Sequence, residues 1–203
     1  MISRVFLGVA IATLTLGACT KTDGSATDSA GLAVDSTAAT TQPAMTFDLT
    51  SAAFAPNGSI PATYTCEGTD VSPPLQWSGG PANVKSYALI VDDPDAPDPA
   101  APKMVYVHWV VYNIPAGTTS LAENAAKTGL PAGASHGSND WKKQTYGGPC
   151  PPIGRHRYFH KLYALDTVLT GLSNPTKAQL EAAITGHVVG RTELIGTYQK
   201  AGR

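Results

Sequence analysis

The sequence predicts a mainly β protein with a few short helices, on three observations. Its 203 residues include 20 glycines and 16 prolines, which favour strands and loops over long helices. Three runs, at residues 85–91, 104–114 and 157–165, are rich in apolar, β-branched and aromatic side chains. Only one segment, late in the chain, has the apolar spacing of a helix.

The three runs predict the main strands. Lys85–Val91 is a continuous apolar run, as in a buried strand. Met104–Ile114 follows and is ended by Pro115, and Arg157–Leu165 ends before Asp166. We expect shorter strands at Thr46–Leu49, Ala62–Thr65 and Pro74–Trp77.

The predicted helix begins after residue 174. Asn174 can cap it and Pro175 suits its first turn. An apolar stripe with four-residue spacing then follows, and Gly190 is expected to end the helix; the stripe consists of Leu180, Ile184 and Val188. Most other residues are predicted to form loops, including a long one over 116–152, and loops of that length are usually functional or disordered.

The N-terminal residues are typical of export. Arg4 precedes an apolar run at 5–16 that is too short to span a membrane, so residues 1–18 are predicted to be a signal peptide. Leu16-Gly17-Ala18-Cys19 resembles a bacterial lipobox, with Cys19 as the lipidated residue. The alternative is an ordinary cleavable signal with a chance cysteine. Lipidation predicts an envelope location, at the outer membrane facing the periplasm if the source is Gram-negative.

After Cys19, residues 19–44 are mostly Ser, Thr, Ala, Gly and Asp, which predicts a flexible tether. Residues 45–203 are predicted to form one folded domain. The formal net charge of −1 disfavours nucleic acid as a partner. We expect the membrane to be contacted only through the N-terminal lipid.

Three segments concentrate polar groups beside apolar strands. Asp92–Pro97 contains three carboxylates in four positions, although a polar turn after a strand would look the same. His108 lies within an apolar strand and is expected to point with Tyr106, Val110 and Tyr112; it could equally be a structural histidine. Tyr146–Tyr158 is dense in Gly and Pro and delivers His156 and Tyr158 onto one strand face. Together, imidazole, phenol and loop amides would suit a small anion.

Two catalytic or metal patterns are weaker. Gly133–Gly137 fits G-x-S-x-G, but the surrounding residues predict loop rather than the strand and helix that a nucleophilic serine requires. His156 and His160 would share a metal ion on a helix, whereas four residues of a strand span about 13 Å. A site of Asp93, His108 and His156 stays an alternative, but we predict no metal and no cofactor.

Several motifs resemble the phosphatidylethanolamine-binding protein family. Asp93-Pro94-Asp95-Ala96-Pro97 matches its DPDxP signature, and Gly147–Tyr158 matches its second signature in the form found in bacterial "Raf kinase inhibitor-like" members of the YbhB/YbcL type. Further similar segments occur in the expected order, at 64–68, 72–77, 108–115 and 130–133. The resemblance implies a Greek-key antiparallel β-sandwich.

The resemblance also implies a site. Four residues would line the family's anion pocket: Asp93, His108, His156 and Tyr158. Three would shape its walls: Pro94, Gly148 and Pro151. Asp93 would either orient a histidine or accept a hydrogen bond from a ligand amine. The connection from Pro152 to His156 is short compared with mammalian members, which leaves the shape of the rim open.

These features predict binding of a small anionic or phosphorylated ligand, such as a phospholipid headgroup, without turnover. The alternatives are a protease inhibitor or other protein-regulatory module with an envelope partner, and a hydrolase that uses the same pocket. Cys66 and Cys150 could form a disulfide in an oxidising compartment or remain two buried thiols.

Overall fold

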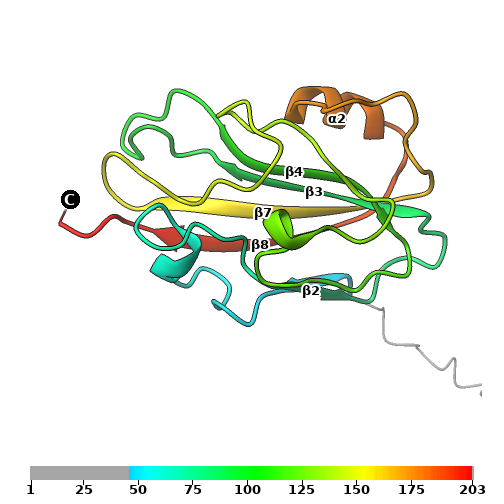
Figure 1. Cartoon of the computed structure of the whole chain (residues 1–203), viewed down its shortest axis with the longest axis horizontal. Coiled ribbons are helices and arrows are strands. Elements are labelled where there is room, and N and C mark those ends of the chain that lie inside the picture. Colours follow the sequence, from blue (N-terminus) through cyan, green and yellow to red (C-terminus); the bar gives the residue numbers. More distant parts are fainter. Residues whose placement is uncertain (1–45, 203) are drawn as a thin grey trace, which may run out of the picture. The chain divides into compact units, whose positions relative to one another are not determined.

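The computed structural model describes residues 46–202 and contains two antiparallel β-sheets (Figure 1). The smaller sheet has the strand order β1–β2–β5, and the larger has the order β6–β4–β3–β7–β8. The small-sheet strands are β1 (Asp48–Thr50), β2 (Leu75–Ser78) and β5 (Ser120–Leu121). The large-sheet strands are β3 (Ser86–Asp93), β4 (Tyr106–Pro115), β6 (Ser135–His136), β7 (His156–Leu165) and β8 (Val188–Tyr198).

The large sheet is buried on both faces, which explains the uninterrupted apolar run of β3. On one face, Leu89 and Val91 pack with Leu75 and Trp77 of the small sheet. On the other face, residues of β3, β4 and β7 pack with the helix α2 (Lys177–Ile184), which Figure 1 shows above the strands. A strand with both faces covered has no need of the alternating pattern of a half-exposed strand. The predicted mainly β fold is therefore confirmed.

Two predicted elements, the strand at 62–65 and the late helix, differ from the structure. Residues 62–64, expected in a strand, form the short 3₁₀ helix η1 (Ala62–Tyr64) after Pro61. Helix α2 begins later than expected, because Thr176 and Gln179 form a reciprocal capping box. The helix also ends earlier than the predicted Gly190, at Ile184. The chain then turns at Gly186, which has φ +83°, a conformation that favours glycine.

The strand β8 was not anticipated. Val188 continues the four-residue apolar spacing of the helix, but it is the first residue of β8, and Gly190 lies inside that strand. Pairing of β8 along β7 determines this conformation, and a single-sequence pattern does not show such pairing. The last helix is thus followed by an edge strand.

The predicted loop over 116–152 contains the strands β5 and β6 and the short helix α1 (Ala125–Thr128). In the part of the chain that the structure describes, no helix is long and apolar enough to cross a membrane. The predicted signal peptide, Cys19 and tether lie outside the described residues.

Candidate ligand-binding site

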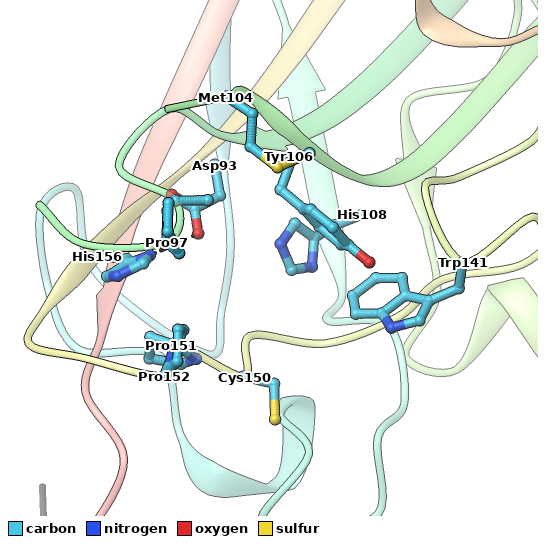
Figure 2. Close-up of a pocket in the computed structure, with 11 residues that line it drawn as sticks. Asp93, Pro97, Met104, Tyr106, His108, Trp141, Cys150, Pro151, Pro152 and His156 are labelled. Carbon is cyan, nitrogen blue, oxygen red and sulfur yellow. Dashed lines mark hydrogen bonds and ion pairs between the residues drawn. The ribbon is translucent and has the colours of Figure 1, made fainter. Parts of the chain in front are cut away.

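A pocket of about 320 Å³ lies where β3 ends and β4 and β7 begin. Figure 2 shows Asp93, Pro97 and His156 on one side, Tyr106, His108 and Trp141 on the other, and Pro151 and Pro152 below Pro97. Its full lining is Asp93, Ala96, Pro97, Met104, Tyr106, His108, Trp141, Cys150, Pro151, Pro152 and His156. The volume is at the lower end of the range for small-molecule sites.

A β-bulge aims His108 at this pocket. Val91 pairs with Trp109 but Asp92 pairs with Val107, so His108 is an extra residue in β4. Strict alternation would have placed His108 with Val110 and Tyr112, as the sequence predicted. Those two side chains pack toward α2 instead, whereas the His108 ring lies 5.2 Å from the Tyr158 ring on the opposite face. Bulges commonly re-aim side chains beside functional sites.

His108 presents one free nitrogen to the pocket. Its Nδ1 lies 2.7 Å from the Gly147 carbonyl oxygen, so Nδ1 carries the proton that is donated. Within residues 46–202, Nε2 has no hydrogen-bond partner. Desolvation lowers the pKa of His108, although the Gly147 carbonyl and nearby carboxylates oppose this effect. In the neutral ring, Nε2 is therefore an acceptor.

His156 is held on both sides. Its Nδ1 donates to Asp93 Oδ2 at 2.7 Å and its Nε2 faces the Ile153 carbonyl oxygen at 2.9 Å. Because both partners are acceptors, only the imidazolium satisfies both bonds. Asp93 Oδ1 accepts from the Asp95 N–H at 2.8 Å. Two roles were considered for Asp93, and the observed bond to His156 fits the role in which Asp93 orients a histidine.

Tyr158, which was expected to line the pocket, is not among the described residues that line it but lies behind His108 and His156, and its hydroxyl is unsatisfied. Its side chain is 1% exposed, and the hydroxyl has no hydrogen-bond partner within the described part of the chain. Its ring lies beside both histidines, 6.5 Å from His156 and 5.2 Å from His108. Burial, reinforced by Asp93, raises the pKa of Tyr158, so the hydroxyl keeps its proton and is a donor. A buried donor without an acceptor costs about 1–3 kcal/mol.

The other two carboxylates of the segment Asp92–Pro97 serve the fold. Asp95 accepts from Arg157 at Nε (2.9 Å) and Nη2 (2.6 Å), and these bonds lower its pKa. Asp92 faces α2, where Lys161 and Lys177 contact it. Asp92 and Asp93 are the last two residues of β3 rather than a turn after it, and strand alternation sends them to opposite faces.

The predicted wall residues are placed differently from one another. Pro151 lines the pocket, whereas Gly148 lines a neighbouring pocket behind the same segment, and Pro94 is absent from the described lining. Sequence reasoning missed Met104 and Trp141 as wall residues. Met104 is 48% and Trp141 38% exposed, and Trp141 packs edge-on against Tyr106. Large apolar residues in loops were the available signal.

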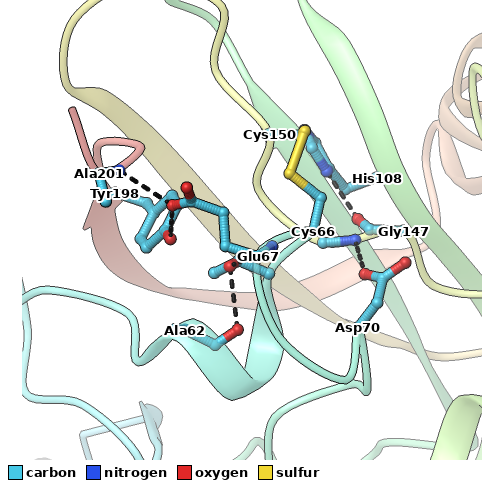
Figure 3. Close-up of a disulfide and its surroundings, with 11 residues drawn as sticks. Ala62, Cys66, Glu67, Asp70, His108, Gly147, Cys150, Tyr198 and Ala201 are labelled. Atoms are coloured by element: carbon cyan, nitrogen blue, oxygen red, sulfur yellow. Dashed lines mark hydrogen bonds between the residues drawn. A yellow bond between two sulfur atoms is a disulfide. The ribbon is translucent and has the colours of Figure 1, made fainter. Parts of the chain in front are cut away.

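Cys66 and Cys150 are joined in a disulfide with an S–S distance of 2.10 Å. Cys150 lines the pocket, and Cys66 lies in the loop that follows η1 (Figure 3). The bridge therefore ties the wall of the pocket to a loop from far along the chain.

The structure also bears on the two weaker patterns, the serine nucleophile of G-x-S-x-G and the metal site. Ser135 lies on the two-residue strand β6 and the next element is the strand β7, so the G-x-S-x-G residues lack the following helix. His136 Nδ1 accepts from Trp109 Nε1 at 3.1 Å. Among residues 46–202, no group of three His, Cys, Asp or Glu side chains is placed to hold a metal ion.

Comparison with known proteins places this arrangement in a family. Residues 50–199 match the model described as "Phosphatidylethanolamine-binding protein". The chain belongs to the phosphatidylethanolamine-binding protein family. This result confirms the resemblance on which the site residues were inferred.

Relatives and solved structures agree with this assignment. A UPF0098 protein of Methanothermobacter thermautotrophicus is 49% identical over 154 residues, which cover 75% of this chain and 99% of the relative. A crystal structure of a phosphatidylethanolamine-binding protein homologue from Chlamydia trachomatis is 41% identical, with a TM-score of 0.69 over 77% of this chain and 99% of that one. Escherichia coli YbcL, described as a member of the mammalian family, is 33% identical with the same TM-score over 76% and 98%.

The aligned region makes up 99% of the Methanothermobacter relative, so that protein consists almost entirely of this domain.

Proposed function

We propose that this domain binds a small phosphorylated ligand, such as a phospholipid headgroup, in the pocket between His108 and His156, without turnover. The observation that carries the proposal is the Tyr158 hydroxyl, a buried donor with no acceptor among the described residues. A phosphate oxygen at the inner end of the pocket would satisfy it. Hydrogen bonds to a charged oxygen are stronger than neutral ones.

The charges near the pocket favour a ligand that shares a proton with His108. Asp93 Oδ2 and His156 Nδ1 lie 2.7 Å apart, so a proton on His156 that satisfies both of its acceptors would form a close ion pair in which the two charges largely cancel. An anionic ligand therefore needs a protonated His108. Otherwise the ligand itself must carry a hydroxyl that donates to the neutral Nε2 of His108. A phosphomonoester near its second pKa of about 6 can supply that proton itself. Tyr158 would then donate to an ionised phosphate oxygen.

The same pocket offers an apolar wall. Met104, Tyr106 and Trp141 lie on the side of His108, and Pro151 and Pro152 lie opposite the strands. Such a wall suits the carbon atoms that accompany a phosphate in a headgroup. The N-terminal signal and Cys19 support the further proposal that the domain is anchored by lipid in the cell envelope.

The test is an NMR titration of residues 45–203 with inorganic phosphate and then phosphoethanolamine, for the wild type and Tyr158→Phe. We expect saturable shifts at His108, His156 and Tyr158. Removal of one hydrogen bond to a charged group should weaken binding by about 10-fold or more, from roughly 1.5–3 kcal/mol. The folded state should lose little stability, because the deleted hydroxyl has no partner in the ligand-free domain.

Tyr163→Phe is the matched control. Tyr163 lies on the same strand as Tyr158 but packs toward α2, so its hydroxyl should not affect binding. Absence of shifts with millimolar phosphate in the wild type would refute the proposal and favour a protein-regulatory role. Release of product from phosphoethanolamine, lost in Asp93→Ala, would instead indicate a hydrolase.

A further inference from the structure

A single peptide group connects His108 to a carboxylate outside the pocket. The carbonyl oxygen of Gly147 accepts from His108 Nδ1 at 2.7 Å. The N–H of Gly148, at the other end of the same peptide, donates to Asp70 Oδ1 at 2.6 Å. Figure 3 shows Asp70, Gly147 and His108 in this order. A second bond, from the Gly147 N–H to the His108 carbonyl oxygen at 3.0 Å, holds the segment against β4.

Asp70 lies on the far side of the pocket wall. It lines a neighbouring pocket of about 340 Å³ with Lys127 and Lys143, and it is not among the described residues that line the ligand pocket. The Gly147–Gly148 peptide is the hydrogen-bonded connection between Asp70 and His108.

The two glycines allow Asp70 to lie close to the Gly147–Gly148 peptide. A Cβ at Gly148 would lie 2.6 Å from Asp70 Oδ1 and 2.4 Å from the Tyr64 carbonyl oxygen, so only glycine fits. A Cβ at Gly147 would lie 2.6 Å from the Trp141 ring. Asp70 itself has φ +53°, in the left-handed region, and Lys127 Nζ donates to its carbonyl oxygen at 2.9 Å. An uncommon conformation held by surrounding contacts often marks a functional position.

We propose that Asp70 is a positioning residue of the ligand pocket, which through the Gly147–Gly148 peptide holds the His108 proton on Nδ1 and turns Nε2 toward the ligand. The carboxylate polarises the peptide and makes the Gly147 carbonyl a stronger acceptor, as expected for linked hydrogen bonds in a buried site. The stronger acceptor fixes the tautomer and stabilises the imidazolium. This inference rests on the proposed phosphate-binding function.

Other groups also act on His108, and the test must separate them from Asp70. Three carboxylates exert a field on its ring, and His160 opposes their effect when protonated; these groups are Asp92, Asp93, Asp140 and His160. Tyr106, Trp141 and Tyr158 contact the ring with their edges or faces. Among the described residues, none of these groups is hydrogen-bonded to Asp70. A substitution of Asp70 therefore tests the link through the Gly147–Gly148 peptide and leaves the other contacts of His108 in place.

The experiment compares wild type, Asp70→Asn and Asp70→Ala in residues 45–203. Imidazole ¹⁵N NMR of the ligand-free protein reports the tautomer and titration midpoint of His108, assigned with a His108→Gln variant. Asp70→Asn keeps an acceptor for the Gly148 N–H but removes the charge, so the midpoint should move to lower pH. Asp70→Ala should in addition mix the two tautomers.

Phosphate binding is the second readout. Orienting partners of metal-bound histidines are worth about 10–100-fold in affinity, and for a hydrogen-bonded anion we expect about 3- to 10-fold weaker binding in Asp70→Asn. The control is Asp98→Asn, because Asp98 also accepts a backbone N–H, from Ala100 at 2.9 Å, in an exposed turn. It should leave both readouts unchanged.

The outcomes are distinguishable. An unchanged tautomer and midpoint in folded Asp70→Asn would overturn the inference and leave Asp70 with a loop-holding role. If wild-type protein does not bind phosphate, the proposed function fails, while the ligand-free ¹⁵N measurement still decides whether Asp70 controls His108. Should Asp70→Ala not fold, Asp70→Asn alone gives the answer.

Discussion

The Tyr158 ring lies beside the rings of both His108 and His156, yet each of the three residues offers a ligand something different. Both ring nitrogens of His156 are held, by Asp93 and by the Ile153 carbonyl oxygen, so His156 has no free donor for a ligand. Tyr158 offers a buried hydroxyl without a partner in the described residues. His108 uses Nδ1 for the Gly147 carbonyl oxygen and keeps Nε2 free for the ligand, so a proton taken up by this ring would face the pocket.

This difference predicts the pH dependence of binding. A phosphodiester such as glycerophosphoethanolamine has no second proton to share, so it needs the His108 imidazolium. Since desolvation lowers the pKa of His108 below the usual value of about 6.5, diester affinity should rise about 10-fold per pH unit as the pH falls through 7 and 6. Below the pKa the affinity should level off.

Calorimetric titrations between pH 5 and 8 would measure this dependence. A phosphomonoester carries its own proton near pH 6, so its affinity should depend on pH less steeply there than that of the diester. Equal diester affinity at pH 5.5 and 8 would contradict the role of His108 as the group that takes up a proton.

At the scale of elements, the end of β3 serves two opposite faces. Asp93 points to the pocket, whereas Asp92, which is fully buried, contacts Lys161 of β7 and Lys177 of α2 at 2.7 and 2.8 Å. This ion triad holds α2 against the sheet, next to the apolar contacts of Leu180 and Ile184. A buried charge is costly to leave without its partners.

Asp92→Asn should therefore destabilise the domain. The two lysine side chains keep 17% and 19% exposure and can reach water, so we expect a loss of about 2–4 kcal/mol in the free energy of unfolding, somewhat below a fully buried pair. Urea unfolding monitored by fluorescence would measure it. Asp166→Asn, in the exposed pair with His187, should change stability by less than about 1 kcal/mol. Equal effects of the two substitutions would contradict this account of α2.

At the scale of the molecule, the disulfide closes a loop between residues 84 positions apart. It connects the loop after η1 with the segment that forms the pocket wall, and that segment also holds His108 and Asp70. Long loops are the ones whose closure removes the most entropy from the unfolded chain.

The double variant Cys66→Ser/Cys150→Ser should lose about 2–5 kcal/mol in the free energy of unfolding, with the entropy of loop closure as the main cause. Urea unfolding with and without reductant would measure it. Reductant should lower the stability of the wild type toward that of the variant and leave the variant unchanged. A thiol titration of the denatured, unreduced protein that finds two free thiols would contradict the disulfide.

The sequence by itself determined the three main strands, the mainly β class and, through its signature motifs, the family. Those features depend on local composition and on short runs that any strand pairing must respect. It did not determine β8, because the four-residue spacing at Val188 suits a helix and only the pairing along β7 makes it a strand. Nor did it place Asp92 and Asp93 within β3.

The tertiary structure alone decided which groups a ligand meets. An alternating strand would have turned His108 toward α2, and the extra residue between two pairs of β3 and β4 turns it into the pocket instead. The bond between Asp93 and His156 and the peptide between Asp70 and His108 join residues distant in sequence, and the packing around Tyr158 buries its hydroxyl without an acceptor among the described residues. A linear pattern carries residue types and spacing, but a bulge and a hydrogen bond across a loop exist only once the chain has folded.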